Sequence, residues 1–434
     1  MNTTADSGAP IVSSVGSSPA RKLLVIDSAF TFEAIRERRL EASVTCRDLD
    51  GFFEHVWTVH PFATLLTSPG WSSKFGRPNR YRLNDRHTFI EGKVGATRWL
   101  QRLFPLNFLI SQLMLFLELR KLIKKERISI IRVGDPLYLG LLGWALARST
   151  GIPFVVRVGG NHDKFYATTG RAITPRLMFN RSIEKKVERF IFPRADLVAG
   201  ANQDNLDFAL ANGARPEAST LFRYGNLIDK RHFLDPADRA LDREALGELG
   251  LQPGKYLLYI GRLEAIKHPE DVILALSHVR GRGYDVKAAL CGDGTERARL
   301  ADLARELGIE DQVVLAGNRS QDWLIHAIAG AAVVVSPHTG RALSEAALGA
   351  APIVAYDVDW QGELIETGVT GELVKHRDQE AFSRSVETML ADPAYARAMG
   401  NAVRERALQM LDPDALDAHE RSEYAKLLAR RCDR

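Results

Sequence analysis

The sequence is poor in cysteine: its three, Cys46, Cys291 and Cys432, lie far apart in the chain. They form no CxxC pair and no Cys/His spacing that would indicate a metal site or a disulfide framework. A strong charge of one sign is also absent, because 58 Lys and Arg against 54 Asp and Glu leave a formal net charge of +4. So small an excess does not predict nucleic-acid binding, but it fits an anionic small ligand or an acidic membrane surface. A reduced, cytoplasmic protein is the simplest interpretation.

Large apolar side chains are almost missing from residues 1–20, which are mainly Ser, Thr, Gly, Ala and Pro. Because this segment lacks the basic start and apolar centre of a signal peptide, we expect it to be a disordered tail. The whole chain has 434 residues, of which 45% are hydrophobic and 26% charged, and that is enough for two ordinary domains.

Long apolar runs are rare, and the one exception covers residues 103–127. It is apolar on nearly every face up to Leu117 and then becomes strongly basic. One interpretation is a buried helix with a solvated basic end. Another is a helix, 106–127, that lies on an anionic membrane surface with its cations near phosphates. A membrane span is disfavoured, because the run is short and is interrupted by polar side chains: Asn107, Ser111, Gln112 and Glu118.

Short apolar runs alternate with helical patterns along the rest of the chain, as buried parallel strands do. In the first half we expect strands at 22–28, 55–62, 127–133, 152–161 and 195–201, and the segment 219–229 closes this half. In the second half we expect them at 255–263, 286–294, 312–318, 331–337 and 351–357, followed by a loop at 362–374. Two such arrays predict an α/β fold of two doubly wound parallel sheets that face each other across a cleft.

Domain boundaries follow from this alternation. We expect a tail at 1–20, an N-terminal Rossmann-like domain at 21–232 and a C-terminal Rossmann-like domain at 233–410. A last helix at 411–434 is expected to pack back on the N-terminal domain.

Candidate ligand-binding residues follow the strands of the second array, where parallel sheets bind ligands. Arg262 and Lys267 lie on a turn before a helix, an arrangement suited to phosphate because two fixed cations add to the helix dipole. The turns after the next strands contribute further candidates. The full expected donor-side set is Gly261, Arg262, Lys267, Gly292, Asp293, Gly317, Asn318, His338, Gly340, Leu343 and Glu345.

The order of the segments "GRLEAIK", "CGDGTER", "LSEAALGAAPIVAYD" and "GELIETGVTGELV" resembles that of retaining, nucleotide-sugar-dependent glycosyltransferases of the GT-B fold, family 4. The resemblance is close over 255–375 and loose in the first half. It implies that Arg262 and Lys267 hold the donor diphosphate, that Gly340 lies near it, and that Glu345 binds the ribose. It also implies a hexosyltransferase that needs no metal or other cofactor. The expected partners are a UDP- or GDP-sugar donor and a glycan or lipid-linked acceptor, in envelope polysaccharide or glycolipid synthesis.

The acceptor side of the cleft is expected after the strand at 152–161, with Asn161, His162 and Asp163 as candidates and His162 near the reacting sugar. One departure lies at the sugar end. The family's first glutamate, eight residues before Glu345, is replaced by Pro337, beside His338. The departure leaves two alternatives open. One is a non-catalytic relative that binds nucleotide sugars or acts as a scaffold, and the other is a different enzyme on this fold, such as a nucleotide-sugar epimerase or a phosphorylase.

Overall fold

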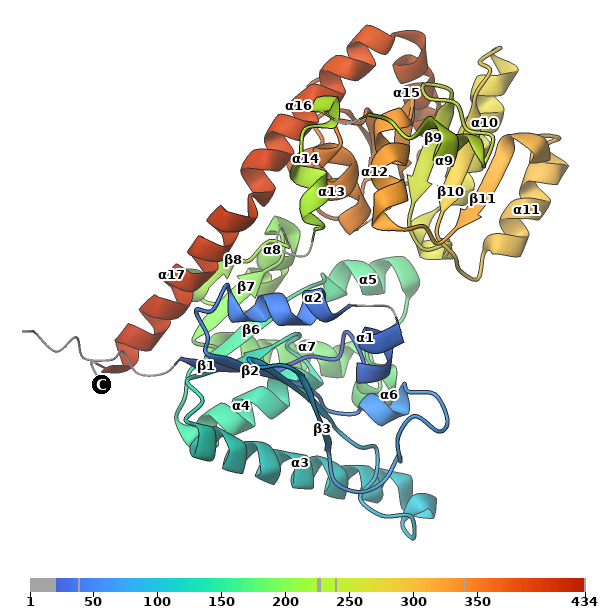
Figure 1. Ribbon diagram of the computed structural model, residues 1–434. Coiled ribbons are helices and arrows are strands. Elements are labelled where there is room, and N and C mark those ends of the chain that lie inside the picture. Colours follow the sequence, from blue (N-terminus) through green and yellow to red (C-terminus); the bar gives the residue numbers. More distant parts are fainter. Residues whose placement is uncertain (1–20, 38–39, 225–227, 239, 339, 433–434) are drawn as a thin grey trace, which may run out of the picture.

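The computed structural model describes residues 21–432 apart from 38–39, 225–227, 239 and 339, so the tail expected at 1–20 lies outside the described residues. The chain forms two α/β domains, one above the other in Figure 1, and the red helices α16 and α17 run along one side of both. The expectation of two doubly wound sheets is confirmed: one sheet has eight strands and the other six.

The N-terminal sheet has the order β3-β4-β2-β1-β5-β6-β7-β8, and all neighbours are parallel except β3 and β4. Its strands are β1 Lys22–Ile26, β2 His55–His60, β3 Asn79–Asn84, β4 His87–Glu91, β5 Ile130–Val133, β6 Phe154–Val158, β7 Leu197–Gly200 and β8 Ser219–Leu221. Its helices are α1 Phe32–Glu37, α2 Glu41–Thr45, α3 Phe104–Glu126, α4 Tyr138–Thr150, α5 His162–Thr169, α6 Pro175–Met178, α7 Arg181–Ile191 and α8 Gln203–Ala211.

The C-terminal sheet is wholly parallel, with the order β11-β10-β9-β12-β13-β14. Its strands are β9 Tyr256–Ile260, β10 Lys287–Cys291, β11 Val313–Gly317, β12 Val333–Ser336, β13 Ile353–Asp357 and β14 Glu372–Lys375. Its helices are α9 Arg243–Gly247, α10 Glu270–Gly281, α11 Arg297–Glu306, α12 Gln321–Gly330, α13 Arg341–Leu348, α14 Gln361–Leu364, α15 Gln379–Ala391 and α16 Pro393–Leu411.

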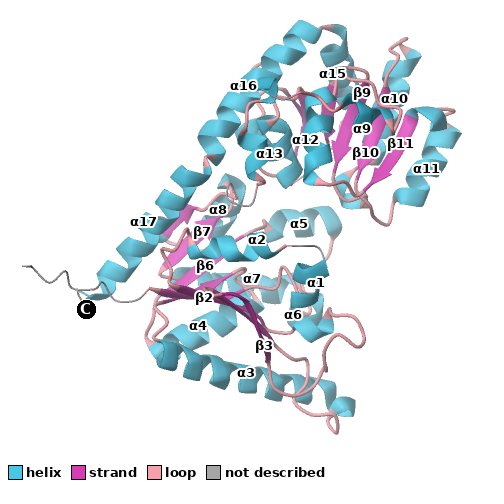
Figure 2. Cartoon of the chain, in the orientation of Figure 1, coloured by secondary structure: helices cyan, strands magenta, loops and turns pink. Residues whose placement is uncertain are grey.

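Helices cover both faces of each sheet (Figure 2), and this explains the unbroken apolar runs of the strands. Along β1, Leu24 and Ile26 point into one core, whereas Leu23 and Val25 point into the core on the opposite face. All four side chains are buried, so no position of the strand needs a polar residue.

The last helix, α17 (Pro413–Cys432), lies against the N-terminal sheet. Its Tyr424 and Leu427 belong to the same core as Leu23 and Val25. A buried ion pair joins Arg132 of β5 to Glu420 of α17, 2.9 Å from Nη1 to Oε1.

Three strands were not expected from the sequence. Strands β3 and β4 extend the edge of the first sheet. Their segment, "NRYRLNDRHTFIE", has no apolar run over β3, because the residues of that strand alternate between half-buried and exposed. The segment 362–374 was expected to be a loop, but it contains the end of α14 and the start of β14. A four-residue edge strand gives too short a pattern to be separated from a turn.

Candidate functional site

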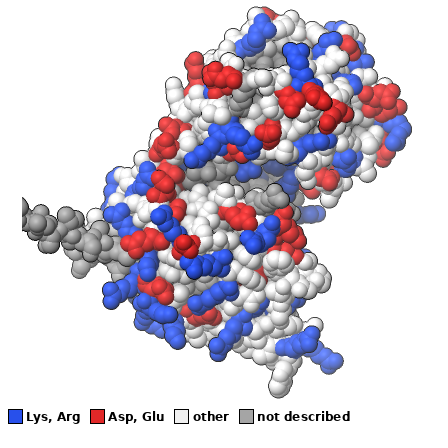
Figure 3. All heavy atoms as spheres, viewed as in Figure 1, with Lys and Arg blue, Asp and Glu red and all other residues white. Residues whose placement is uncertain are grey.

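A cavity of about 700 Å³ lies between the two domains, where the carboxyl ends of both sheets meet. Figure 3 shows the constriction between the domains on one face of the molecule. The N-terminal domain contributes Gly159, Gly160, Asn161, Asn202, Arg223 and Tyr224 to its wall. From the C-terminal domain, the polar and charged wall residues are Arg262, Lys267, Gln321, Arg341, Ser344, Glu345 and Asp359.

Two cations and a helix end converge on this cavity. Gly261 and Arg262 directly follow β9, and Lys267 lies on the turn before α10. The N-terminus of α13 also opens into the cavity through Gly340 and Arg341, and Gly340 provides no side-chain cap. Because the first amides of a helix lack partners within that helix, this end adds donors and a positive dipole to the side-chain charges. The arrangement is suited to a diphosphate.

The pKa of Lys267 is lowered from its usual value. Burial is the main cause and the charge of Arg262 adds to it, whereas Asp359 acts in the opposite direction. Two cations held close together without a bound anion repel each other, so an anion placed between them relieves an existing electrostatic cost.

Glu345 lies on α13 at the same wall of the cavity. It is almost fully buried, and Arg341 lies 3.2 Å away across one helical turn, from Nε to Oε1. A carboxylate fixed in this way can accept hydrogen bonds from the hydroxyls of a ligand.

His338 does not line the cavity, although we expected it among the donor-binding residues. Its Nδ1 lies 2.9 Å from the carbonyl oxygen of Ile266, and its Nε2 lies 2.6 Å from Oδ2 of Asp359. Asp359 does line the cavity, from the turn that follows β13. The ring therefore connects the turn that carries Lys267 to a carboxylate that faces the ligand.

The pKa of Asp359 is lowered. Burial would raise it, but the hydrogen bond with His338 and the charges of Lys267 and Lys164 outweigh that effect. The carboxylate is therefore held ionised beside the two cations of the cavity.

The "CGDG" segment, residues 291–294, does not line the cavity but packs against the turn that carries Gly261 and Arg262. A Cβ at Gly292 would lie 1.9 Å from the carbonyl oxygen of Gly261, and one at Gly294 would lie 2.3 Å from that of Leu263. These glycines let the two turns pack in contact, and the amide of Leu263 donates to the carbonyl of Asp293 at 3.0 Å. Gly292 and Asp293, which we expected at the ligand, therefore lie outside the lining of the cavity.

Three other expected donor residues also lie outside the lining of the cavity: Gly317, Asn318 and Leu343. Gly317 ends β11 at a positive φ of 68°, and its carbonyl accepts a hydrogen bond from the amide of Gly292. Leu343 is fully buried in the core beneath α13. It lies three residues after Gly340, on the side of the helix that faces the sheet.

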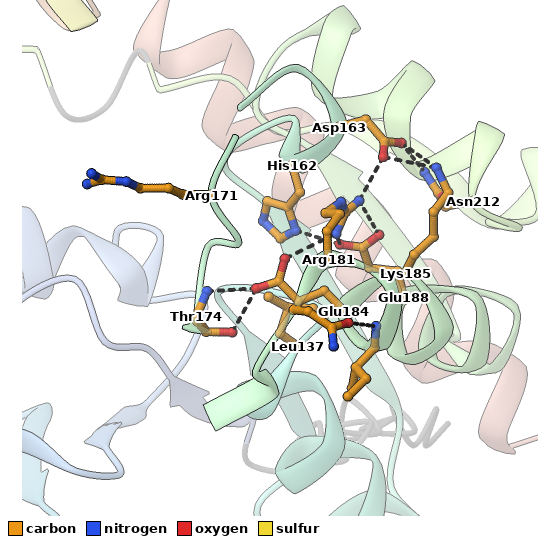
Figure 4. A network of polar contacts seen from close by, with 12 residues as sticks. Leu137, His162, Asp163, Arg171, Thr174, Arg181, Glu184, Lys185, Glu188 and Asn212 are labelled. Atoms are coloured by element: carbon orange, nitrogen blue, oxygen red, sulfur yellow. Dashed lines mark hydrogen bonds and ion pairs between the residues drawn. The ribbon is translucent and has the colours of Figure 1, made fainter. Parts of the chain in front are cut away.

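His162, which is buried, and Asp163, which is partly exposed, belong to a polar network between α5 and α7 and do not line the cavity, which corrects the expectation that they face the cleft (Figure 4). Nδ1 of His162 lies 2.7 Å from Oε1 of Glu188, whose pKa is lowered although burial acts against this. Arg181 donates to both oxygens of Glu188, at 2.6 and 2.7 Å, and to Asp163 at 2.9 Å. The network fixes α5 to α7.

Asn161 precedes this network and does line the cavity. It is the N-cap of α5, and its side-chain oxygen accepts a hydrogen bond from the amide of Lys164. The polar network thus positions the turn of Gly159, Gly160 and Asn161 and leaves its inner side open to a ligand.

The sequence interpretation missed several lining residues: Asn202, Arg223, Tyr224, Gln321, Arg341, Ser344 and Asp359. Arg341 and Asp359 each had a signal, since the first follows Gly340 directly and the second follows a strand end. Among the described residues, no three His, Cys, Asp and Glu side chains gather in a way that could hold a metal ion.

Comparisons with known proteins agree with this geometry. Residues 244–406 match the family model "Glycosyl transferases group 1". An alpha-D-kanosaminyltransferase from Streptomyces kanamyceticus is 28% identical over 59% of this chain and 66% of its own length. A GDP-mannose-dependent phosphatidylinositol monomannoside mannosyltransferase from Mycolicibacterium smegmatis is 28% identical over 70% of this chain and 78% of its own. The chain spans 39% to 66% of the length of the first five curated relatives.

Solved structures share the fold along almost the whole chain. Sucrose-phosphate synthase from Thermosynechococcus elongatus has a TM-score of 0.71 at 19% identity, with 94% of this chain and 100% of that chain covered. HepE from Anabaena, in complex with UDP-glucose, has a TM-score of 0.64 at 17% identity, with 93% and 99% covered. At such identities these likenesses show the fold. Residues 244–406 therefore resemble the glycosyl transferases group 1 family, and the chain as a whole has the GT-B fold of these solved structures.

Proposed function

We propose that this protein is a glycosyltransferase that moves a hexose from a UDP- or GDP-sugar to a glycan or lipid-linked acceptor. One observation carries the proposal: Arg262, Lys267 and the N-terminus of α13 converge on a cavity between the domains, with the Glu345 carboxylate on the same wall. The names of the relatives support it, because they include kanosaminyl- and mannosyltransferases. One structural neighbour was solved with UDP-glucose.

In this mechanism the diphosphate of the donor lies against Arg262, Lys267 and the first amides of α13. The bond between the sugar and the diphosphate lengthens, the sugar gains oxocarbenium character, and negative charge builds on the leaving phosphate. The fixed cations stabilise that charge without reorganising, which is how preorganised electrostatic groups accelerate a reaction. Glu345 would accept hydrogen bonds from the ribose hydroxyls and so fix the nucleoside.

At the sugar end we assign the carboxylate role to Asp359. Its Oδ2 is held by His338, and Oδ1 accepts no hydrogen bond from any described residue. The side chain is 37% exposed and lines the cavity, so this oxygen can accept hydrogen bonds from sugar hydroxyls. His338 then acts as a positioning residue. The Asp359 carboxylate, from a neighbouring turn, takes the role of the family's first glutamate, whose position is occupied by Pro337 in this chain.

The acceptor would approach from the wall formed by Gly159, Gly160 and Asn161. Retention of the anomeric configuration, independence from a metal cofactor, and a role in envelope polysaccharide or glycolipid synthesis are further parts of the proposal, and they rest on the family resemblance. The names of relatives that act on phosphatidylinositol and undecaprenol compounds favour a lipid-linked acceptor. With such an acceptor, we propose that the protein works in the cytoplasm, peripheral to the inner face of a membrane.

A donor panel tests the proposal. Purified protein is incubated with UDP-, GDP- and ADP-sugars, with and without lipid extract from a cell envelope, and release of nucleoside diphosphate is measured. We expect release with one donor class, stimulated by the extract, and a sugar-bearing product by mass spectrometry. Conversion of the donor into an isomer without acceptor would instead identify an epimerase. Tight nucleotide binding with no turnover of any donor would identify a non-catalytic relative.

A further inference from the structure

Helix α3 lies along the side of the N-terminal domain that is remote from the C-terminal domain (Figures 1 and 2). Among the described residues, it belongs to the one helical segment, Gln101–Glu126, that is long and apolar enough to cross a membrane. The structure fixes it as a surface helix, because Leu115, Leu119, Leu122 and Ile123 pack into the core beneath the sheet.

In the first half of α3 the polar side chains are buried and several leucines are exposed, which is the reverse of the usual pattern on a surface helix. Asn107, Ser111 and Gln112 are buried. Asn107 Oδ1 accepts from the amide of Ala96 at 2.7 Å, and Ser111 Oγ donates to the carbonyl of Lys93 at 2.7 Å. Asn107, Ser111 and Gln112, which interrupt the apolar run in the sequence, therefore attach the helix to the domain.

The outward side of α3 is a stripe of leucines. Leu106, Leu109, Leu113 and Leu117 follow one another at intervals of three or four residues, so they share one face of the helix, and each is 49% to 64% exposed. Trp99, just before the helix, is 89% exposed. A helix on a soluble domain normally turns such a stripe inward, so this face indicates an apolar partner.

Cations adjoin the stripe at its C-terminal end. Arg120, Lys121, Lys124 and Lys125 form, with Leu117, a shallow hollow of about 470 Å³. Within the described part of the chain, the one ion pair of these cations is between Lys125 and Glu126, at 3.8 Å. Arg120 Nε is buried and has no hydrogen-bond partner there. In Figure 3 blue side chains gather at the lower left of the molecule, and its lower right combines white surface with a smaller blue group.

We propose that this face, which we call the α3 face, docks on an anionic lipid bilayer. The leucine stripe enters the boundary between headgroups and acyl chains, and the hollow takes the phosphate of an anionic headgroup. A bilayer accounts for both halves of the face, because it offers an apolar layer directly beneath a layer of negative charge. The α3 face lies away from the donor cavity, so this proposal stands or falls independently of glycosyl transfer.

Co-sedimentation with vesicles tests it, in the absence of any donor. We expect the protein to bind vesicles of phosphatidylcholine with about 30% phosphatidylglycerol, bind pure phosphatidylcholine far less, and be released at high salt. Lys121→Ala/Lys124→Ala/Lys125→Ala should lower binding about 100-fold. The matched control, Lys230→Ala/Lys255→Ala/Lys375→Ala, removes three exposed lysines from other surfaces and should leave binding unchanged.

The double variant Leu109→Glu/Leu113→Glu should abolish binding to either vesicle while thermal unfolding stays near that of the unchanged protein, because both side chains are exposed. Three results would overturn the proposal. One is equal loss of binding in the control triple variant, and another is no binding to anionic vesicles at all. The third is a dimer in light scattering that the double variant converts to a monomer, without vesicle binding; that would assign the α3 face to a second copy of this chain.

Discussion

Arg223 and Glu363 form an ion pair between the two domains, 2.6 Å from Nη1 to Oε2. Arg223 lines the cavity after β8, and Glu363 lies on α14, where its other oxygen accepts a hydrogen bond from the amide of Gln203 at 2.7 Å. Lys164 adds a second link, since its Nζ donates to the carbonyl of Val358 at 3.1 Å. These contacts set how closely the two walls of the cavity approach each other.

Glu363→Gln should favour domain opening. The variant keeps an oxygen for Gln203 but loses the charge opposite Arg223, and a partly buried pair of this kind contributes about 1 kcal/mol. We expect a larger radius of gyration by small-angle X-ray scattering and a donor KM raised roughly 5-fold. Glu366→Gln is the control, because Glu366 pairs with Arg406 inside the C-terminal domain. Equal effects of the two variants would contradict the assignment.

Lys267→Ala should lower kcat by about 10²- to 10³-fold, the effect typical of removing a preorganised electrostatic group. The affinity for free nucleoside diphosphate should fall as well, because the same ammonium contacts the ground-state phosphates. Lys375→Ala removes an exposed lysine of the same domain and serves as the control. Calorimetry with UDP and GDP, together with turnover, checks the prediction. Near-normal kcat in a folded Lys267→Ala protein would refute the assignment of this residue to the phosphate site.

Asp359→Ala separates the sugar end of the site from its phosphate end. Loss of a charged hydrogen-bond acceptor should lower kcat/KM for the nucleotide sugar about 10- to 150-fold. Binding of free nucleoside diphosphate should be unchanged or tighter, because a negative charge near the phosphates is removed. His338→Phe should weaken turnover in the same direction, with a smaller effect, and Asp357→Ala is an exposed control two residues away. Parallel losses of sugar-nucleotide and diphosphate binding would count against a sugar-specific role.

His60 should make the protein sensitive to mild acid. Burial lowers its pKa to about 4, and both ring nitrogens are buried without hydrogen-bond partners among the described residues. Between pH 6.5 and about 4 the unfolded chain therefore binds the proton that the folded chain excludes, so the free energy of unfolding falls as the pH falls. The full effect is roughly 3 kcal/mol.

His60→Leu should remove this part of the acid sensitivity and leave stability at pH 7 equal or higher, because two unpaired polar atoms leave the core. Urea unfolding at pH 7, 5.5 and 4.5 gives the comparison. His87, whose pKa is also lowered to about 4, remains in both proteins, so the slope should become smaller without vanishing. An unchanged slope would show that His60 is not the responsible group.

The sequence predicts the alternation of strands and helices because both faces of each sheet are buried, which leaves unbroken apolar runs. It predicts Arg262, Lys267 and Glu345 for a related reason, since parallel strands bring their carboxyl ends to one edge. It does not predict the partner of His338. Asp359 lies 21 residues further along and meets His338 only because β12 and β13 are neighbours in the sheet.

His162 shows the opposite failure. Its position after a strand favoured a place in the cleft, but α5 begins at this residue and turns the ring toward Glu188 on α7. Which side of a short helix faces a cavity depends on packing against a distant helix, and the local pattern carries little information about it.

The contact between α17 and the first sheet has a consequence for how the chain is made. Leu23, Val25 and Phe53 are synthesised long before Tyr424 and Leu427, yet all five side chains belong to one core. Arg132 likewise forms its ion pair with Glu420, a residue that is synthesised much later. While the residues between Phe53 and Tyr424 are translated, this apolar surface lacks the cover that α17 later provides. The N-terminal domain thus completes this core only after the C-terminal domain has been synthesised, so the order of folding differs from the order of synthesis.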